Sequence, residues 1–401
     1  MGWRIGSRES GERQPINKME TRNIMKREAL ILSLIGSFAT IGVAQAETSV
    51  TLYGVVDTGY GYSQRKINKS GIDYSTTASG MHDSYLSGSR FGFQGVEDLG
   101  DGLRAIFVLE SGINPSDGTT VTPRMFHRES NVGLSSDFWG TFSMGRQYNL
   151  ADPFFSINST SSMGDIDKTF GAASVRVDNM FRYMTPNFSG FQAGVGYAAN
   201  GAIVRNNQDP DVNNRDRDSY LSLGVQYTDQ ELHAVATYDR AGSGKSEHAA
   251  TSWALVGSYD FGLAKLALGY GQDRYGKING VGAFGDNALF AQIFAKAGSA
   301  ITDYDEFLMS HDFKASNYYV GLSVPVGGGT AGFAWARTSS NLDDADKLGD
   351  YAGDQNIYST RYVYPLSKRT SVYIYGSYGK NIAYIDGLKA TEAGVGLNHS
   401  F

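Results

Sequence analysis

The sequence predicts an all-β protein, a 16-stranded antiparallel β-barrel that spans a membrane. Three observations support this fold class. Runs of alternating apolar and polar residues occur in pairs along most of the chain. Short turns and long polar loops connect successive runs alternately. A membrane-spanning helix needs a run of 18 or more apolar residues, and after residue 46 the chain has no such run. A closed barrel satisfies all its backbone hydrogen bonds internally, so it is the β-structure that can cross a bilayer.

The alternation has the period of two that is typical of strands. Leu221, Leu223, Val225 and Tyr227 share one face of a run, and small or polar residues occupy the other face. Sixteen such runs are predicted, near residues 49–63, 88–97, 102–112, 127–136, 140–147, 179–187, 190–200, 218–228, 231–241, 250–260, 263–274, 316–325, 330–340, 355–365, 370–380 and 391–401. An even number of strands suits a closed antiparallel barrel.

The connections fall into two classes by length. Short turns are predicted near residues 99, 138, 188, 229, 261, 327 and 367. The connections between them are longer and polar. In outer-membrane barrels the short turns face the periplasm and the long loops face outward.

Composition agrees with a barrel and argues against some other classes. The chain has 401 residues, with 50 Gly, 25 Tyr and no Cys, and its mean hydropathy is -0.30. A slightly polar average is expected when every second strand residue faces water in a lumen. No dense basic patch with interleaved aromatic residues is present, so nucleic acid is not expected as a partner. A soluble β-sandwich rich in tyrosine is the alternative, and the regular asymmetry of turns and loops favours the barrel.

Residues 1–46 are expected to be an N-terminal extension and a signal peptide. Met25-Lys26-Arg27 forms a basic start, an apolar stretch follows, and Ala44-Gln45-Ala46 supplies the small residues read by a signal peptidase. We expect the true start at Met25 and cleavage after Ala46. The barrel domain is then residues 47–401.

Five stretches resemble the general porins of Gram-negative outer membranes, in particular the trimeric, 16-stranded porins of the neisserial and β-proteobacterial branch. The first reads Ser-Val-Thr-Leu-Tyr-Gly-Val-Val-Asp at residues 49–57. The others are residues 88–100, residues 132–134 with 145–148, residues 178–183 with 186–191, and residues 394–401. The resemblance spans the whole chain after the signal and implies a water-filled channel for passive diffusion of small hydrophilic solutes and ions.

The resemblance also implies a constriction inside the channel. The third loop, about residues 148–178, is expected to fold inward, with these acids: Asp152, Asp165, Asp167 and Asp178. A cluster of arginines is expected on the facing wall, with these candidates: Arg90, Arg146, Arg128, Arg182 and Arg104. Strand alternation supports Arg90, because it faces inward if Phe91 and Phe93 face outward. For Arg128 and Arg146 the alternation leaves both faces open.

Two positions depart from the branch pattern. Asn149 and Met184 stand where related porins commonly have acids. Both changes make the constriction less negative, so a preference for anions is the expected direction.

The end of the chain resembles the signal recognised by the outer-membrane assembly machinery. It combines Val395 and Leu397 with a terminal Phe401. The chain is expected to form a homotrimer. Its other expected partners are outer-membrane lipid and lipopolysaccharide. No catalytic residues, metal site or cofactor are predicted. A solute-specific channel on the same barrel is the nearest alternative function, and a barrel enzyme or an adhesin belongs to other classes.

Overall fold

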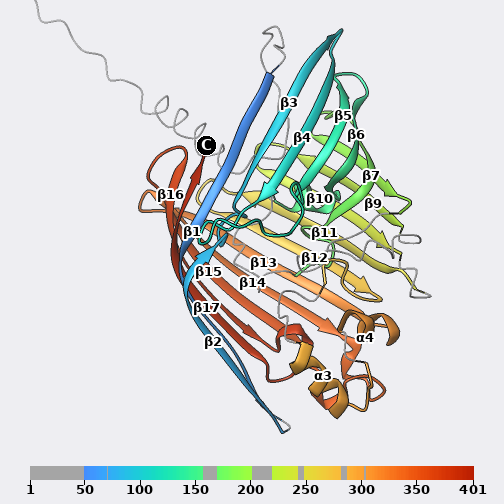
Figure 1. Ribbon diagram of the computed structural model, residues 1–401, viewed down its shortest axis with the longest axis vertical. Helices are drawn as coiled ribbons and strands as arrows, with labels where there is room; N and C mark the ends of the chain where they lie inside the picture. The colour runs from blue at the N-terminus through green and yellow to red at the C-terminus, as the bar shows by residue number, and fades with distance from the viewer. Residues whose placement is uncertain are drawn as a thin grey trace, which may run out of the picture. The chain divides into compact units, whose positions relative to one another are not determined.

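The protein is described from a computed structural model that covers residues 49–69, 71–156, 169–200, 219–242, 248–280, 287–301 and 304–401. The expected signal segment therefore lies outside the described residues. Strands dominate the rest of the chain (Figure 1). Among the described residues, no helix combines the length and the apolar character needed to cross a bilayer.

The strands are β1 Ser49–Lys69, β2 Ile72–Asp83, β3 Arg90–Gly100, β4 Leu103–Gly112, β5 Glu129–Ser136, β6 Gly140–Tyr148, β7 Arg176–Met184, β8 Phe191–Ala198, β9 Tyr220–Thr228, β10 Leu232–Ala241, β11 Ala250–Asp260, β12 Lys265–Arg274, β13 Lys314–Val326, β14 Gly329–Ser340, β15 Gln355–Pro365, β16 Thr370–Lys380 and β17 Lys389–Ser400. The helices are α2 Ala151–Ser156, α3 Asn287–Lys296 and α4 Tyr304–Ser310, and three short 3₁₀ turns are η3 Asn341–Asp343, η4 Gly349–Tyr351 and η5 Ile382–Tyr384.

The sheet closes on itself as an antiparallel barrel. Each strand from β3 to β17 pairs with the next one along the chain. Strand β1 completes the ring, because it pairs with β17 on one edge and with β3 on the other. The predicted 16-stranded barrel is confirmed, and it is wide enough to hold an aqueous channel.

One strand segment was not predicted from the sequence. The structure has 17 segments in the sheet, because β2 occupies residues expected to be loop. β2 and β3 lie end to end along the same edge of β1: Asp83 is opposite Thr58, and Arg90 is opposite Val55. They are two parts of one barrel position, interrupted by residues 84–89. Most of β2 is exposed, so its pairing with β1 leaves no alternating apolar pattern in the sequence.

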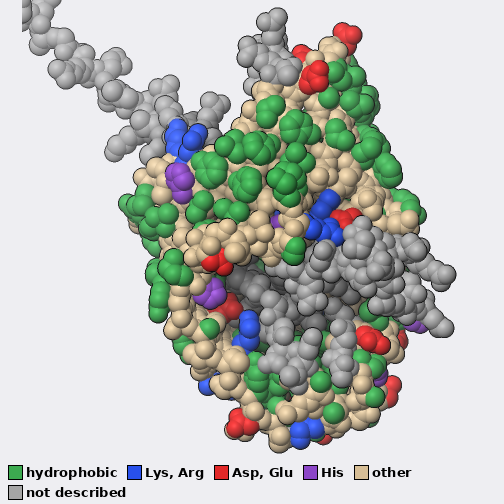
Figure 2. All heavy atoms as spheres, viewed as in Figure 1, with side chains coloured by type: hydrophobic (Ala, Val, Ile, Leu, Met, Phe, Trp, Pro, Cys, Tyr) green, Lys and Arg blue, Asp and Glu red, His purple; other side chains and the backbone are tan. Residues whose placement is uncertain are grey.

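The two faces of the barrel differ as the alternation predicts. The outer face carries exposed apolar side chains, among them Leu52, Phe93, Val132, Phe181, Leu223, Leu255, Leu268, Phe333, Ile374 and Val395. Figure 2 shows hydrophobic side chains gathered over the wall near β1, β3 and β4. The inner face of β10, by contrast, carries His233, Thr237 and Asp239. Lipid therefore meets apolar groups, and the lumen is lined by polar ones.

The described parts of the β6–β7 connection fold into the barrel. Phe170 packs against Ala254 and Val256 on the inner face of β11, and the backbone N–H of Leu150 donates to Ser222 Oγ on β9 at 3.0 Å. Residues 157–168 in the middle of this connection lie outside the described residues. The inward course of the connection agrees with the prediction. Its boundary does not, because β7 begins at Arg176, so Asp178 belongs to the wall.

A second folded unit covers the inner face at the long-loop end of β13 to β17. Helices α3 and α4 of the β12–β13 connection pack with the 3₁₀ turns η3 to η5 and with the tip of the β1–β2 hairpin (Figure 1). Its fully buried side chains include Phe294, Phe307, Phe313 and Tyr384. The Phe294 and Phe307 rings are stacked with their centroids 4.5 Å apart. We call this unit the helical cap.

We expect Phe307→Ala to loosen the helical cap without opening the barrel ring. Loss of a buried phenylalanine costs about 3–5 kcal/mol, and the strand hydrogen bonds do not involve this side chain. Trypsin should then cleave after Lys296 faster than in the native protein. The control is Phe333→Ala, which removes an exposed outer-face ring of β14. Equal cleavage rates in all three proteins would contradict this role for Phe307.

Candidate functional site

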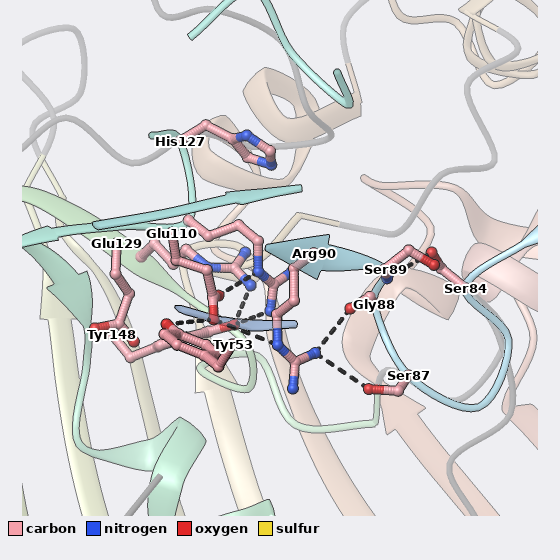
Figure 3. Close-up of polar contacts among 12 residues, drawn as sticks. Tyr53, Ser84, Ser87, Gly88, Ser89, Arg90, Glu110, His127, Glu129 and Tyr148 are labelled. Carbon is pink, nitrogen blue, oxygen red and sulfur yellow. Dashed lines mark hydrogen bonds and ion pairs between the residues drawn. The ribbon is translucent and has the colours of Figure 1, made fainter. Parts of the chain in front are cut away.

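The site is built around one buried carboxylate on the inner wall. Glu110 projects from β4 opposite Gly92 of β3. Its Oε1 accepts a hydrogen bond from Arg128 Nε at 2.5 Å, and its Oε2 lies 3.3 Å from Arg90 Nε. Tyr53 on β1 donates its hydroxyl to Oε2 at 3.0 Å. Figure 3 shows these groups converging from several strands.

Three arginines contact Tyr148 at the end of β6. Its hydroxyl accepts from Arg128 Nη2 at 3.0 Å and from Arg176. The Arg176 guanidinium also lies over the Tyr148 ring, 4.2 Å from its centroid. Arg182 Nη1 donates to the Tyr148 carbonyl at 3.1 Å. Arginine suits such a place because its planar guanidinium stays charged and can both stack and hydrogen-bond.

A neighbouring cluster holds Arg146. Arg146 Nη1 donates to Asp178 Oδ1 at 2.6 Å, and Arg146 Nε donates to the His127 carbonyl at 2.5 Å. Asp178 also accepts from Arg124 Nη1 at 2.9 Å. Arg146 is opposite Ser130, and a register shift separates Gly145 from Gln147 in the pairing of β6 with β7. This irregularity is why simple alternation could not assign the face of Arg146.

Residues 84–89, the interruption between β2 and β3, anchor Arg90. Arg90 Nη1 donates to Ser87 Oγ at 3.1 Å and to the Gly88 carbonyl at 2.7 Å (Figure 3). A Cβ at Gly88 would stand 3.0 Å from Arg128 Nη1. Glycine at this position therefore lets the segment come close to both arginines. We call residues 84–89 the wall insert.

Asp57 of β1 holds the wall insert in place. Its Oδ2 accepts from the backbone N–H groups of Leu86 at 3.1 Å and Ser87 at 2.8 Å. Asn398 donates to the same oxygen at 3.0 Å, and Tyr373 donates to Oδ1 at 2.5 Å. Four donors thus surround one fully buried carboxylate. Hydrogen bonds to a charged acceptor are stronger than neutral ones, so Asp57 fixes the insert and, through it, Arg90.

The charges of these two clusters do not cancel. Six arginines lie in or beside the two clusters: Arg90, Arg124, Arg128, Arg146, Arg176 and Arg182. Four carboxylates face them: Glu110, Glu129, Asp152 and Asp178. Burial raises the pKa of Asp152, and the nearby Arg176 opposes that rise. With all ten groups ionised the excess is two positive charges.

The structure brings together some of the predicted site residues and separates others. Arg90, Arg128 and Arg182 join the cluster around Glu110 and Tyr148, and Arg146 lies in the adjoining cluster. Arg104 does not join them. It pairs with Asp137 at the short-turn end, six residues along β4 from Glu110, or about 20 Å. Asp165 and Asp167 lie outside the described residues.

Several functional side chains were missed in the sequence. Glu110, Glu129 and Tyr148 were not singled out, nor were Asp57, Arg124 and Arg176 assigned to the wall. The register between strands supplies the missing signal. Glu110 is opposite Gly92, and Glu129 is opposite Glu110. Gly92 shares the inward face of Arg90, so Glu110 and Glu129 face inward too. Alternation along one strand cannot give that alignment.

Asn149 links the start of the inward connection to the opposite wall. Its Nδ2 donates to Asp239 Oδ1 at 3.0 Å, to Tyr220 Oη at 3.1 Å and to the Ala172 carbonyl at 2.8 Å. A carboxylate at this position would face Asp239 directly. Met184 lies at the end of β7 next to Gly194. The structure thus gives a physical reason for an amide at position 149.

The C-terminal residue completes the first barrel seam. The backbone groups of Phe401 and Gly54 exchange two hydrogen bonds of 3.1 Å. The Phe401 ring lies where a Cβ of residue 54 would be, 2.4 Å away. Val395 and Leu397 are exposed on the outer face. Among the described residues, no group of three or more His, Asp or Glu side chains has the arrangement of a metal site.

A closed barrel with an apolar exterior and a charged, polar lumen defines a membrane channel. The Gram-negative porin family matches residues 32–383, and the chain belongs to that family. The resemblance seen in the sequence is thereby confirmed.

Individual relatives agree. An outer membrane porin protein of Bordetella pertussis is 36% identical over 408 residues, covering 94% of this chain and 100% of the relative. The major outer membrane protein P.IB of Neisseria meningitidis is 28% identical over 383 residues, covering 94% and 100%. Among solved structures, an anion-selective porin from Comamonas acidovorans has a TM-score of 0.64 and 26% identity, and covers 88% of this chain and 100% of that one. The protein is therefore an outer-membrane channel for passive diffusion, not an enzyme.

We expect Asp57→Asn to release the wall insert. The change removes the charge that four donors share, and a buried hydrogen bond to a charged group is worth about 1.5–3 kcal/mol. The variant should show faster tryptic cleavage after Arg90 and noisier single-channel currents. The control is Asp98→Asn at the exposed end of β3. If both variants keep native currents and cleavage rates, Asp57 does not hold the insert.

We also expect His127 to make the barrel less stable in acid. Burial, with Arg176, Arg128 and Arg146 nearby, lowers its pKa from 6.5 to about 4. Between these values the unfolded chain binds a proton that the folded chain does not, so stability falls as the pH drops through this window. Thermal unfolding of His127→Gln should therefore depend less on pH across it. Parallel pH profiles of variant and native protein would exclude this contribution.

Proposed function

We propose that this porin is an anion-preferring diffusion channel whose constriction lies between the arginine clusters and the infolded β6–β7 connection. The observation that carries the proposal is the excess of arginine over carboxylate in the two clusters on the lumen wall. Support comes from the related porin of Comamonas acidovorans, which is described as anion-selective.

The arrangement suggests how selection works. Arg90 and Arg128 share Glu110, so each guanidinium is only partly neutralised. Low-dielectric walls focus the remaining field on the narrow part of the channel. Rings of charged side chains are a general means by which wide pores favour one sign of ion. Anions entering this region are attracted, and cations are repelled.

The roles of Asp152, Asp178 and the arginines follow from this proposal. Asp152 stands in α2 at the start of the infolded connection and faces Arg176. It supplies the negative side of a transverse field, with Arg176 on the positive side. Asp178 restrains Arg124 and Arg146. Asp165 and Asp167 would add to the negative side from the part of the loop outside the described residues.

The remaining proposals concern export and assembly. We infer that residues 1–46 contain the cleaved signal and that the barrel domain begins at residue 47. The final strand, with Val395, Leu397 and Phe401, would be the segment read by the assembly machinery. The exposed apolar wall fits both lipid and a homotrimer interface, and lipopolysaccharide would surround the outer end.

We expect Arg90→Gln or Arg128→Gln to lower the anion preference about threefold, because a unit charge acts on an ion roughly 7 Å away in water with about 0.6 kcal/mol. The measurement is the reversal potential of single channels in a salt gradient. Arg104→Gln is the control, since Arg104 pairs with Asp137 at the short-turn end. Block by one particular solute would instead indicate a solute-specific channel. An unchanged reversal potential in both lumen variants would contradict the proposed constriction.

A further inference from the structure

The β12–β13 connection holds the returning half of the infolded β6–β7 connection. Asn279 Nδ2 donates to the Phe170 carbonyl at 3.1 Å and to the Ala173 carbonyl at 3.2 Å. The backbone N–H of Asn279 donates to the Gly171 carbonyl at 2.7 Å. A side-chain amide has two N–H donors, so this residue uses both of them, and its main chain, on one short stretch of the infolded connection.

Lys277 adds a buried charge to this contact. Its side chain is only 3% exposed, and Nζ donates to the Thr169 carbonyl at 3.0 Å. The Asp273 carboxylate on β12 attracts the same ammonium group. A buried charge is unfavourable unless it is paired and hydrogen-bonded, so both partners fix the position of Lys277. We call Lys277 and Asn279 the loop clamp.

The loop clamp is part of a tight turn. The Gly280 N–H donates to the Lys277 carbonyl at 2.9 Å, and Gly280 has a φ of 76°, which favours glycine. Ile278, between the two clamp residues, is fully buried. It belongs to one apolar cluster with Val175 and Val177, where the infolded connection enters β7. The turn therefore contacts the infolded connection through main-chain carbonyls and also through apolar side chains at its end.

The loop clamp and helices α3 and α4 of the helical cap belong to the same β12–β13 connection (Figure 1). The two ends of this connection meet where the Tyr275 N–H donates to the Phe313 carbonyl at 2.8 Å, and Phe313 is part of the cap core. Tyr319 on β13 packs against that core and also against the cluster around Phe170. Two sets of contacts therefore join the helical cap to the infolded connection, one through the clamp turn and one through the Tyr319 ring.

The start of the infolded connection is attached differently. Asn149 bonds to Asp239 and Tyr220, which are strand residues of the closed ring. Backbone hydrogen bonds hold each strand of such a ring on both edges, whereas loops are the more mobile parts of a protein. The start of the infolded connection is therefore fixed to the wall, and the position of its return depends on another loop.

We propose that the loop clamp couples the helical cap to the constriction, so that a change in the cap alters the current through the channel. Lys277 and Asn279 are positioning residues, because they act on the constriction through the main chain of another loop. The inference deepens the constriction proposed above and rests on it. It adds a mechanical link from the long-loop end of the protein to its narrowest part, through hydrogen bonds to four main-chain carbonyls.

The first test replaces Asn279 by an acid of nearly the same shape. In Asn279→Asp a carboxylate oxygen replaces Nδ2, so both side-chain hydrogen bonds are lost. Two ordinary hydrogen bonds amount to about 2 kcal/mol, which is roughly thirtyfold in an equilibrium. In single-channel recordings, the time spent away from the main current level, relative to the time in it, should rise by this factor.

The matched control is Asn356→Asp. Asn356 Nδ2 also donates to a main-chain carbonyl, that of Asp354 at 3.3 Å, but the residue lies on the outer face of β15 beside Trp335. The control adds the same charge and removes the same kind of bond without touching the infolded connection. Its currents should stay as steady as those of the native protein.

Lys277 gives a second variant and a rescue. Lys277→Met keeps the length of the side chain but loses the donor to Thr169, so its current should leave the main level as Asn279→Asp does. Lys277→Arg keeps a charged donor and should be steadier than Lys277→Met. The methionine variant also serves if Asn279→Asp does not fold. Native steadiness in the folded variants of both clamp residues would overturn the loop clamp.

A double-mutant cycle tests the link to the cap. Phe307→Ala loosens the cap core and should itself make the current leave its main level more often, whereas Phe333→Ala on the outer wall should not. Combined with Asn279→Asp, Phe307→Ala should have less than its single effect, because changes that act through one shared contact are not additive. Full additivity, or native currents in Phe307→Ala, would overturn the coupling.

Failure of this inference and failure of the proposed anion preference are distinguishable. The reversal potential of Arg90→Gln tests the charge of the constriction, and the current steadiness of Asn279→Asp tests its support. An unchanged reversal potential together with unsteady clamp variants would remove the anion preference and keep the loop clamp. A shifted reversal potential together with steady clamp variants would keep the anion preference and remove the clamp.

Discussion

Every other feature of this molecule depends on the pairing of main-chain N–H and C=O groups around a complete ring. In hydrocarbon, an unpaired backbone group costs several kcal/mol. An open sheet edge would expose a whole row of such groups. Pairing of β1 with both β17 and β3 removes the last edge. Only then can side chains be assigned to lipid on one face and to water on the other.

The lumen is shaped by segments folded back onto the inner wall, and buried polar side chains hold each of them. Asp57 accepts hydrogen bonds from two backbone N–H groups of the wall insert. Asn149 ties the start of the β6–β7 connection to Asp239. At the far end of that connection a Cβ on Gly171 would lie 2.4 Å from Asp273 Oδ1, so glycine permits the close approach. A carboxylate on a strand is a fixed acceptor, and several donors can share it at low cost in entropy.

Much of this architecture could be read from the sequence, because a barrel repeats the same rule at each strand. The ranges near 250–260, 355–365 and 370–380 agree with β11, β15 and β16 to the residue. The rule failed for β2, whose side chains are mostly exposed on both faces, so nothing in their hydropathy distinguishes strand from loop. The inward direction of Arg90 followed from alternation. The partnership of Arg90 with Glu110 depends on the register between β3 and β4, which alternation along a single strand does not give.

The seam between β1 and β17 joins residues from the two ends of the barrel sequence, such as Asp57 and Asn398, 341 positions apart. Such non-local contacts form late, because the entropy of a large loop of chain must be lost before the contacts can stabilise the fold. Until the last strand arrives, the first one keeps a bare edge that could join a foreign strand. The topology therefore requires that this edge be protected while the barrel assembles. The need for protection ends when β17 pairs with β1 and the hydrogen bond between Asp57 and Asn398 forms.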